Sequence, residues 1–333
     1  MGGSLNRIAR SIVRVALAVA LCIVAGLAGL AVALRQPTLR ALEYSGLSRS
    51  DPRLLREHVN FLATTVRPRS AAHPENLDRA AVYIGAHFGA AGGRVSEQPF
   101  EARGRTYRNV IAEFGPRDLA APLLVLGAHY DAFSEKGSLP GADDNASGTA
   151  GLLDLARLLG KSHPRTPVML VAFTTEEPPF FGSDDMGSAV HAASLAAAHR
   201  AIRGMICLEM IGYYSGQQAW PAALFGLFYP DRGNFIGVAG GWQDRRLARF
   251  VKNAIRGAGG IPVYSFSGLR ETSDASDQRN YWSRGWSAVM VTDTAYMRNP
   301  NYHTVRDTAE TLDYERMGLV MDGVLNAVLH HDD

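Results

Sequence analysis

Acidic and imidazole side chains in five short segments of this 333-residue chain have the types that metal-dependent hydrolysis requires. The segments are His129-Tyr130-Asp131, Gly141 to Gly148 with its Asp143-Asp144 pair, Glu176-Glu177, Glu209 and Tyr302-His303. Most of them come directly after a short apolar run that is typical of a buried strand. Imidazoles and carboxylates bind zinc, and carboxylates also transfer protons, so together the segments predict a hydrolytic centre with two zinc ions.

The first segment pairs an imidazole with a carboxylate two residues later. On extended backbone, residues two apart point to the same side, so Asp131 can accept the second ring N–H of His129. This arrangement fixes the tautomer of a metal-binding histidine and raises its basicity. Taken alone, the tripeptide is more often an ordinary polar loop than a metal site.

The second segment places two adjacent carboxylates before an expected helix. Asp144 and Asn145 there can be N-terminal caps that complement the helix dipole. The functional interpretation assigns Asp143 as a bridge, with one carboxylate oxygen on each of two divalent ions. Both interpretations are open from the residues alone.

The remaining segments supply a carboxylate pair, a single carboxylate and a second imidazole. Glu176 and Glu177 repel each other unless cations neutralise them; one can bind metal while the other takes a proton from a metal-bound water. Glu209 follows an apolar run, where its burial is costly unless it meets a cation. A solvated acidic loop or a structural His303 is the alternative for each segment by itself.

Apolar runs that alternate with helical patterns must position these groups. The chain opens with expected helices near 52–62 and 77–92 and with strand-like stretches at 94–101 and 107–114. Strands are then expected at 123–126, 168–173, 204–208 and 288–291, and helices at 148–159, 186–198, 247–257 and 312–329. This alternation predicts an α/β fold, a three-layer sandwich in which a mixed, mostly parallel sheet carries helices on both faces. Residues 213–241, rich in Gly, Tyr, Phe and Pro, are too long for an ordinary connection and are a candidate cover for the site.

The N-terminal region has the composition of a membrane segment. Residues 15–34 carry no charged side chain, and this stretch has about the length that crosses a bilayer core. Three basic residues precede it: Arg7, Arg10 and Arg14. We expect a cytoplasmic tail and membrane anchor at 1–34, a connector at 35–50 and an extracytoplasmic catalytic domain at 51–333. The alternative is a cleaved signal peptide, because residues 31–33 resemble a cleavage site, and the domain would then be secreted.

Charge and cysteine content exclude other classes. With 34 basic and 32 acidic side chains the net charge is only +2, so nucleic acid is not an expected partner. Cys22 lies in the membrane segment and Cys207 in an expected buried strand, so no disulfide is predicted. The sequence does not indicate an oligomeric state.

The ordered series of these motifs resembles the co-catalytic di-zinc exopeptidases, which include bacterial aminopeptidases, glutamate carboxypeptidases and, more distantly, glutaminyl cyclases. The series is H-x-D, G-A-D-D-N-x-S-G, E-E, an acidic residue after a strand, T-D-T and Y-H-T-x-x-D-T, and it covers the chain from about residue 51. The conjunction is specific although each part alone is weak.

The resemblance implies a role for each matching residue. It implies that Asp143 bridges two Zn²⁺ ions and that the peptide bond between Asp143 and Asp144 is cis. The remaining roles it implies are His129 and Glu209 at one zinc ion, Glu177 and His303 at the other, Glu176 as general base, Asp131 as the group that orients His129, and Tyr302 as an oxyanion donor. We therefore expect a zinc exopeptidase acting on peptide substrates, with aminopeptidase action favoured over carboxypeptidase action.

Three alternatives remain at this stage. A glutaminyl-cyclase-like enzyme uses one zinc and normally lacks the first metal histidine, so His129 counts against it. A non-catalytic membrane scaffold on the same fold typically loses several ligands, and here all are present. A hydrolase of non-peptide amides shares the core chemistry. Pro178 to Phe181 and Gln278 depart from the usual family residues, so side-chain preference is not carried over.

Overall fold

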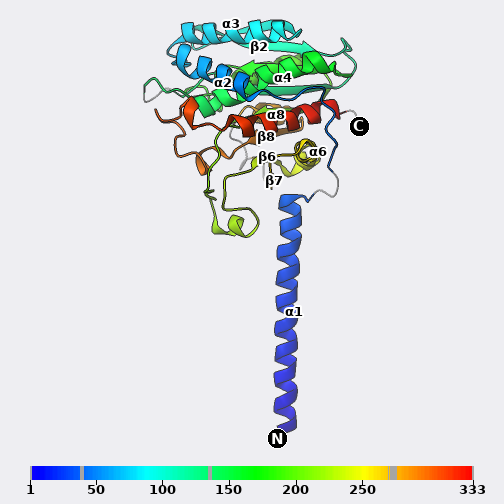
Figure 1. The fold of residues 1–333 in the computed structure, drawn as a ribbon. Helices are drawn as coiled ribbons and strands as arrows, with labels where there is room; N and C mark the ends of the chain where they lie inside the picture. Colours follow the sequence, from blue (N-terminus) through cyan, green and yellow to red (C-terminus); the bar gives the residue numbers. More distant parts are fainter. Residues whose placement is uncertain (1, 38–40, 134–136, 269, 271–275, 332–333) are drawn as a thin grey trace.

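The computed structural model describes residues 2–37, 41–133, 137–268, 270 and 276–331, with the side chains of 2–6 and 223–224 left out of the description. Its first helix, α1 (Gly2–Arg35), extends away from the rest of the chain (Figure 1). In the described part of the chain, α1 is the one helix long and apolar enough to cross a membrane, over Arg7–Arg35. At 1.5 Å per residue those 29 residues span about 44 Å, more than a bilayer core requires.

An eight-stranded sheet forms the centre of the remaining chain, in the order β1-β2-β4-β3-β5-β8-β6-β7. Its strands are β1 (Arg94–Ala102), β2 (Arg105–Phe114), β3 (Leu123–His129), β4 (Val168–Phe173), β5 (Ile202–Leu208), β6 (Ile236–Gly241), β7 (Val263–Gly268) and β8 (Ala288–Thr292). The pairs β4-β3, β3-β5, β5-β8 and β6-β7 are parallel, whereas β1-β2, β2-β4 and β8-β6 are antiparallel. The predicted mixed, mostly parallel sheet is confirmed.

Helices cover both faces of the sheet, because the central strands are apolar on both sides. Along β3, Leu124 and Leu126 belong to one core and Leu123 and Val125 to the other, as the two-residue period of a strand requires. The first core includes α2 (Pro52–Asn60), α3 (Pro74–Ala90), α4 (Gly148–Ser162), α6 (Arg245–Ala258) and α8 (Tyr314–Leu329). The second includes α5 (Gly187–Ala197) and α7 (Gln278–Trp282), which completes the three layers.

Two strands escaped the sequence analysis. β6 lies inside the stretch 213–241, and its sequence Ile-Gly-Val-Ala-Gly-Gly is too rich in glycine for a strand signal. β7 is an edge strand in which serine residues alternate with aromatic ones, so its sequence resembles that of a polar connection. Aromatic side chains of the 213–241 stretch pack on this edge, with the rings of Trp220 and Tyr229 centred 5.6 and 4.7 Å from that of Phe266.

Candidate metal centre

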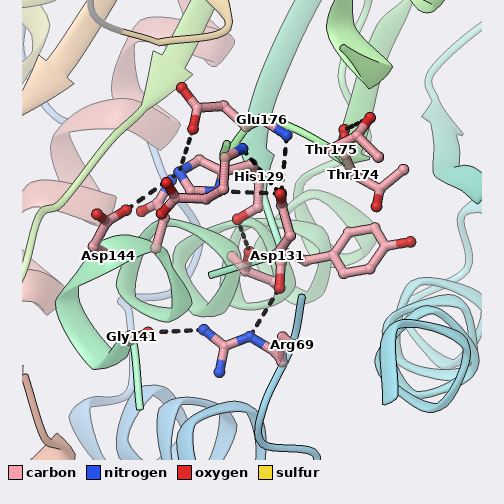
Figure 2. Close-up of polar contacts among 12 residues, drawn as sticks. Arg69, His129, Asp131, Gly141, Asp144, Thr174, Thr175 and Glu176 are labelled. Atoms are coloured by element: carbon pink, nitrogen blue, oxygen red, sulfur yellow. Dashed lines mark hydrogen bonds and ion pairs between the residues drawn. The ribbon is translucent and has the colours of Figure 1, made fainter. Parts of the chain in front are cut away.

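The last residue of β3, His129, presents its two ring nitrogens to different carboxylates. Nδ1 lies 3.4 Å from Asp131 Oδ1, whereas Nε2 lies 3.4 Å from Asp144 Oδ1 and 3.3 Å from Glu209 Oε2. Figure 2 shows the imidazole between Asp131 and Asp144. The Thr149 hydroxyl donates to the His129 carbonyl at 2.8 Å, which links the end of β3 to α4. The ring therefore turns Nε2 toward the acidic cluster and leaves Nδ1 to Asp131, the expected orientation.

Two groups of three side chains converge next to this ring. His129, Asp144 and Glu209 form one group, Asp144, Glu177 and His303 form the other, and within each the ligand atoms lie within 4.8 Å of one another. Asp144 belongs to both, because its Oδ1 faces His129 and its Oδ2 lies 2.9 Å from His303 Nε2. A carboxylate with one oxygen toward each of two imidazoles stands where a bridge between two cations would stand.

The assignment of the bridge to Asp143 was wrong by one residue. The Asp143 carboxylate is buried away from both imidazoles, and it accepts hydrogen bonds from the Gly212 amide at 3.0 Å and from Asn299 Nδ2 at 2.7 Å. The cis peptide is also displaced by one residue, since it joins Asp144 to Asn145. Asp143 thus fastens the loop to neighbouring segments, while Asp144 supplies the carboxylate of the site.

The capping interpretation holds for Asn145. Its Oδ1 accepts from the Gly148 amide at 3.1 Å at the start of α4, and its Nδ2 donates to Glu209 Oε2 at 3.2 Å. Ser276 donates to the same Glu209 oxygen at 2.6 Å. Asn145, expected only as a possible cap, and Ser276, to which no role was assigned, therefore hold the Glu209 carboxylate in place.

Asp131 organises the Glu176-Glu177 pair as well as His129. Its two carboxylate oxygens accept the backbone amides of Glu176 at 3.2 Å and Glu177 at 3.0 Å. Glu176 is outside both groups of three, and its Oε2 lies 3.8 Å from His129 Nε2. The pair is thus divided, with Glu177 among the convergent ligands and Glu176 beside them.

His303 lies between two aromatic rings. Phe133 stacks on it with centroids 4.0 Å apart and an interplanar angle of 7°, and Tyr302 stacks on it at 3.8 Å and 17°. The His303 side chain keeps 23% of its surface exposed, so this edge of the site faces outward. Burial and the nearby Asp144 carboxylate raise the pKa of Tyr302, which keeps its phenol protonated.

Two further residues support the site through backbone atoms. Arg69 is fully buried, and its guanidinium donates to the carbonyls of Tyr130 at 2.8 Å, Pro140 at 3.0 Å and Gly141 at 2.8 Å (Figure 2). Asp307 accepts the amides of Asp143 at 2.9 Å and Asp144 at 3.1 Å. Asp307 is the acidic residue of the Y-H-T-x-x-D-T motif, to which no role was assigned. Nothing in the sequence around Arg69 indicates its contacts.

The electrostatics of the site call for cations. Burial, together with the charge of Asp144, raises the pKa of Glu177 to about 7. Burial alone would lower the pKa of His303, but hydrogen bonds to Asp144 and Glu177 raise it to about 9. One oxygen of Glu177, Oε1, is buried, and among the described residues its polar contact is the long one of 3.5 Å to His303 Nε2. Divalent cations would satisfy these groups, and the imidazole and carboxylate donors are those that zinc accepts.

An α/β sheet whose strand ends and loops gather such a donor set indicates a metal-binding site. A family model fixes the class more narrowly: the model of Peptidase family M28 matches residues 109–328, and the chain belongs to this metallopeptidase family.

The chain is similar in sequence or in fold to several known proteins. The chain is 48% identical over 300 residues to the uncharacterized protein YfbL of Escherichia coli, covering 87% of this chain and 91% of that protein. It is 27% identical over 209 residues to leucine aminopeptidase 1 of Arthroderma otae, covering 60% of this chain but only 51% of the fungal enzyme. Among solved structures, the LapA aminopeptidase of Legionella pneumophila has the same fold, with a TM-score of 0.68, 19% identity and coverage of 84% of this chain and 71% of that one. A glutaminyl cyclase of Tannerella forsythia gives a TM-score of 0.66 at 19% identity, covering 85% and 99% of the two chains.

Proposed function

We propose that this protein is a zinc-dependent aminopeptidase with two metal ions. The observation that carries the proposal is the position of Asp144, which is shared by a His129-Glu209 group and a Glu177-His303 group. Two Zn²⁺ ions in these groups would supply Lewis acidity and lower the pKa of a water toward ~7.

Glu176 is the residue placed to move protons. It is 6% exposed, and burial raises its pKa, which favours a carboxyl group that takes up and returns protons. Because Asp131 fixes its backbone amide, Glu176 holds its place beside the ligands rather than among them. We propose that Glu176 takes a proton from the attacking water and then delivers that proton to the leaving amine.

Tyr302 is proposed as a donor to the oxyanion that forms on the substrate carbonyl. Its ring packs on His303, and its raised pKa keeps the hydroxyl able to donate a hydrogen bond. His303 is at the partly exposed side of the site, where a peptide would approach.

The membrane segment completes the proposal. We propose that α1 is a retained anchor, with Arg7, Arg10 and Arg14 on the cytoplasmic side and the catalytic domain on the other. Its junction with the catalytic domain supports this, because Lys252 of α6 donates to the carbonyls of Arg35 and Gln36 at the end of the helix. Peptides in the extracytoplasmic space are then the proposed substrates.

The test compares metal content and turnover in the full chain purified in detergent. The substrates are a panel of aminoacyl chromogenic amides and a peptide with N-terminal glutamine, the probe for the cyclase alternative. We expect Glu176→Gln to keep two zinc ions per chain and to lose at least 100-fold in kcat. Glu315→Gln, an exposed glutamate on α8, is the matched control and should leave both unchanged.

Each other outcome identifies an alternative. Full activity of Glu176→Gln would refute the role of Glu176. If the protein binds a single zinc ion and cyclises the peptide with N-terminal glutamine, the function would be that of a glutaminyl cyclase and not of an aminopeptidase. If the zinc-loaded protein turns over none of these substrates, a carboxypeptidase or a scaffold would be favoured.

A further inference from the structure

Residues 219–230, between β5 and β6, form an apolar tip. They carry no charged side chain, and they include the short helix η3 (Ala223–Leu227). Leu227 is 72% exposed, and Pro221 and Ala222 are also exposed. None of these residues takes part in the proposed catalysis. An exposed apolar segment of this kind marks a surface that meets a partner or a membrane.

Aromatic side chains within the apolar tip hold its shape. Trp220 Nε1 donates to the Pro230 carbonyl at 3.0 Å, which closes the base of the loop. The Trp220 ring stacks on Phe225 with centroids 6.2 Å apart and an interplanar angle of 15°, and it lies 5.2 Å from the ring of Tyr229. Leu227 keeps its exposure although these rings pack together, so the tip presents an apolar side chain to its surroundings on a fixed base.

The membrane helix enters the catalytic domain without a spacer. Residues 15–34 of α1, which carry no charge, rise about 30 Å, the thickness of a bilayer core. The next residues, Arg35 and Gln36, are already attached to the domain, because Lys252 donates to both of their carbonyls. The surface of a bilayer crossed by α1 therefore lies directly against the domain, close to Arg35.

The apolar tip lies on the same side of the domain as α1. The Tyr229 hydroxyl donates to the Ser265 carbonyl of β7 at 3.0 Å, and the Tyr229 ring lies 6.2 Å from that of Tyr264. The centre of the Tyr264 ring lies 5.3 Å from the Arg35 guanidinium at the end of α1. In Figure 1 the yellow-green loop before β6 projects on the side of the domain from which α1 leaves, down to the level of the last turns of α1, whereas α3 lies at the opposite end. A bilayer crossed by α1 thus extends to the apolar tip.

We infer that the apolar tip inserts into the extracytoplasmic leaflet and attaches the catalytic domain to the bilayer at a second point beside α1. Leucine and aromatic side chains are typical of segments that enter the boundary between headgroups and acyl chains. A second copy of the chain would also cover an apolar surface, but the plane of the bilayer, fixed by α1, already lies at this position. The inference rests on the proposed retention of α1, and it is independent of the catalytic proposal.

The experiment measures the depth of the apolar tip in the full chain, reconstituted in vesicles of equal parts phosphatidylcholine and phosphatidylglycerol. A nitroxide label is attached to Leu227→Cys in a Cys22→Ala background, in which the buried Cys207 stays unlabelled. Val82→Cys is the matched control, because Val82 is 63% exposed on α3, at the end of the domain opposite α1 (Figure 1). Oxygen dissolves in hydrocarbon and a polar nickel chelate does not, so the ratio of their collision rates with the label should be about tenfold higher at residue 227 than at residue 82. A charge is costly in hydrocarbon, so Leu227→Asp should lower the ratio at an Ala222→Cys label to that at residue 82, and Val82→Asp should leave it unchanged.

Other results overturn the inference. Equal ratios at residues 227 and 82 would place the apolar tip in water, and shielding of the label at residue 227 from both oxygen and nickel would place it against protein, as in a contact between two copies. An unchanged ratio at residue 222 in Leu227→Asp would also refute insertion. Retention of α1 is tested separately, since an intact mass lacking residues 1–33 in native membranes would refute the anchor and leave the ratios of the full chain unchanged. The catalytic proposal is separate as well, because Glu176→Gln should abolish turnover without changing these ratios.

Discussion

Replacement of Asp131 by asparagine tests the support of the metal site without removing a ligand. Asp131 accepts the amides of Glu176 and Glu177 and faces His129 Nδ1 at 3.4 Å. In Asp131→Asn one oxygen becomes an NH₂ group, so a donor faces a donor and one buried amide loses its acceptor. The imidazole also loses the negative charge that raises its basicity.

The magnitude follows from these losses. A buried amide without a partner costs about 1–3 kcal/mol, which corresponds to roughly 5- to 150-fold in an equilibrium constant. Removal of a carboxylate that orients a ligand histidine typically costs about 10- to 100-fold in metal affinity or activity. We therefore expect Asp131→Asn to weaken zinc binding and to lower kcat/KM by about 10- to 100-fold each.

The assay is a zinc titration against a chromophoric chelator, followed by kcat/KM on an aminoacyl chromogenic amide. Asp118→Asn is a matched control, because the exposed Asp118 also accepts two backbone amides, from Ala120 at 2.9 Å and Ala121 at 3.2 Å. The control should bind zinc as the wild type does. If Asp131→Asn also keeps wild-type zinc affinity, the argument that this carboxylate supports the site is refuted.

The remaining predictions concern the ligands, protonation and the buried arginine. Asp144→Asn should lose both zinc ions in metal analysis. Asp143→Asn should keep both zinc ions and lower only the free energy of unfolding, measured by urea denaturation. The reverse result would restore Asp143 as the bridge. Zinc affinity should rise with pH between about 6 and 9, because Glu177, with its pKa raised to about 7, and His303, with its pKa raised to about 9, must lose protons that compete with the metal. Calorimetry in buffers of different ionisation enthalpy should detect proton release at pH 6.5, and a pH-independent affinity would contradict the assignment. Arg69→Met should cost about 3 kcal/mol or more in urea denaturation, since it leaves buried carbonyls without donors; a loss below 1 kcal/mol would show that the guanidinium is dispensable.

The sequence was sufficient for the layers of the fold because the central strands are continuous apolar runs. β3, β4 and β8 are buried along their whole length, and such runs between amphipathic helices are a strong signal. β6 and β7 lacked that signal, since glycine or serine occupies much of each strand. Their place in the sheet depends on pairing with β8 and with each other, which local sequence does not encode.

The ligand types were predictable, but the choice within the Asp143-Asp144 pair was not. Both residues are buried carboxylates in one loop, and both are 4% exposed or less. Which one faces the imidazoles depends on long-range contacts: the Gly212 amide and Asn299 bind Asp143 and leave Asp144 to His129 and His303.

The same reasoning explains why Arg69 and Asp307 escaped notice, and why Asp131 was assigned to His129 but not to the backbone of Glu176 and Glu177. Arg69, Asp131 and Asp307 act on main-chain amides and carbonyls, and any residue type can present those atoms. A motif records the side chains that a metal or a proton requires, whereas the partners of a backbone amide leave no pattern in the sequence around it. The segments that carry His129, Asp144 and the Glu176-Glu177 pair are nevertheless each held by such a contact, so the positions of these ligands depend on the three residues as much as on the ligand motifs. This dependence is why Asp131→Asn, which preserves every proposed ligand, is expected to weaken zinc binding.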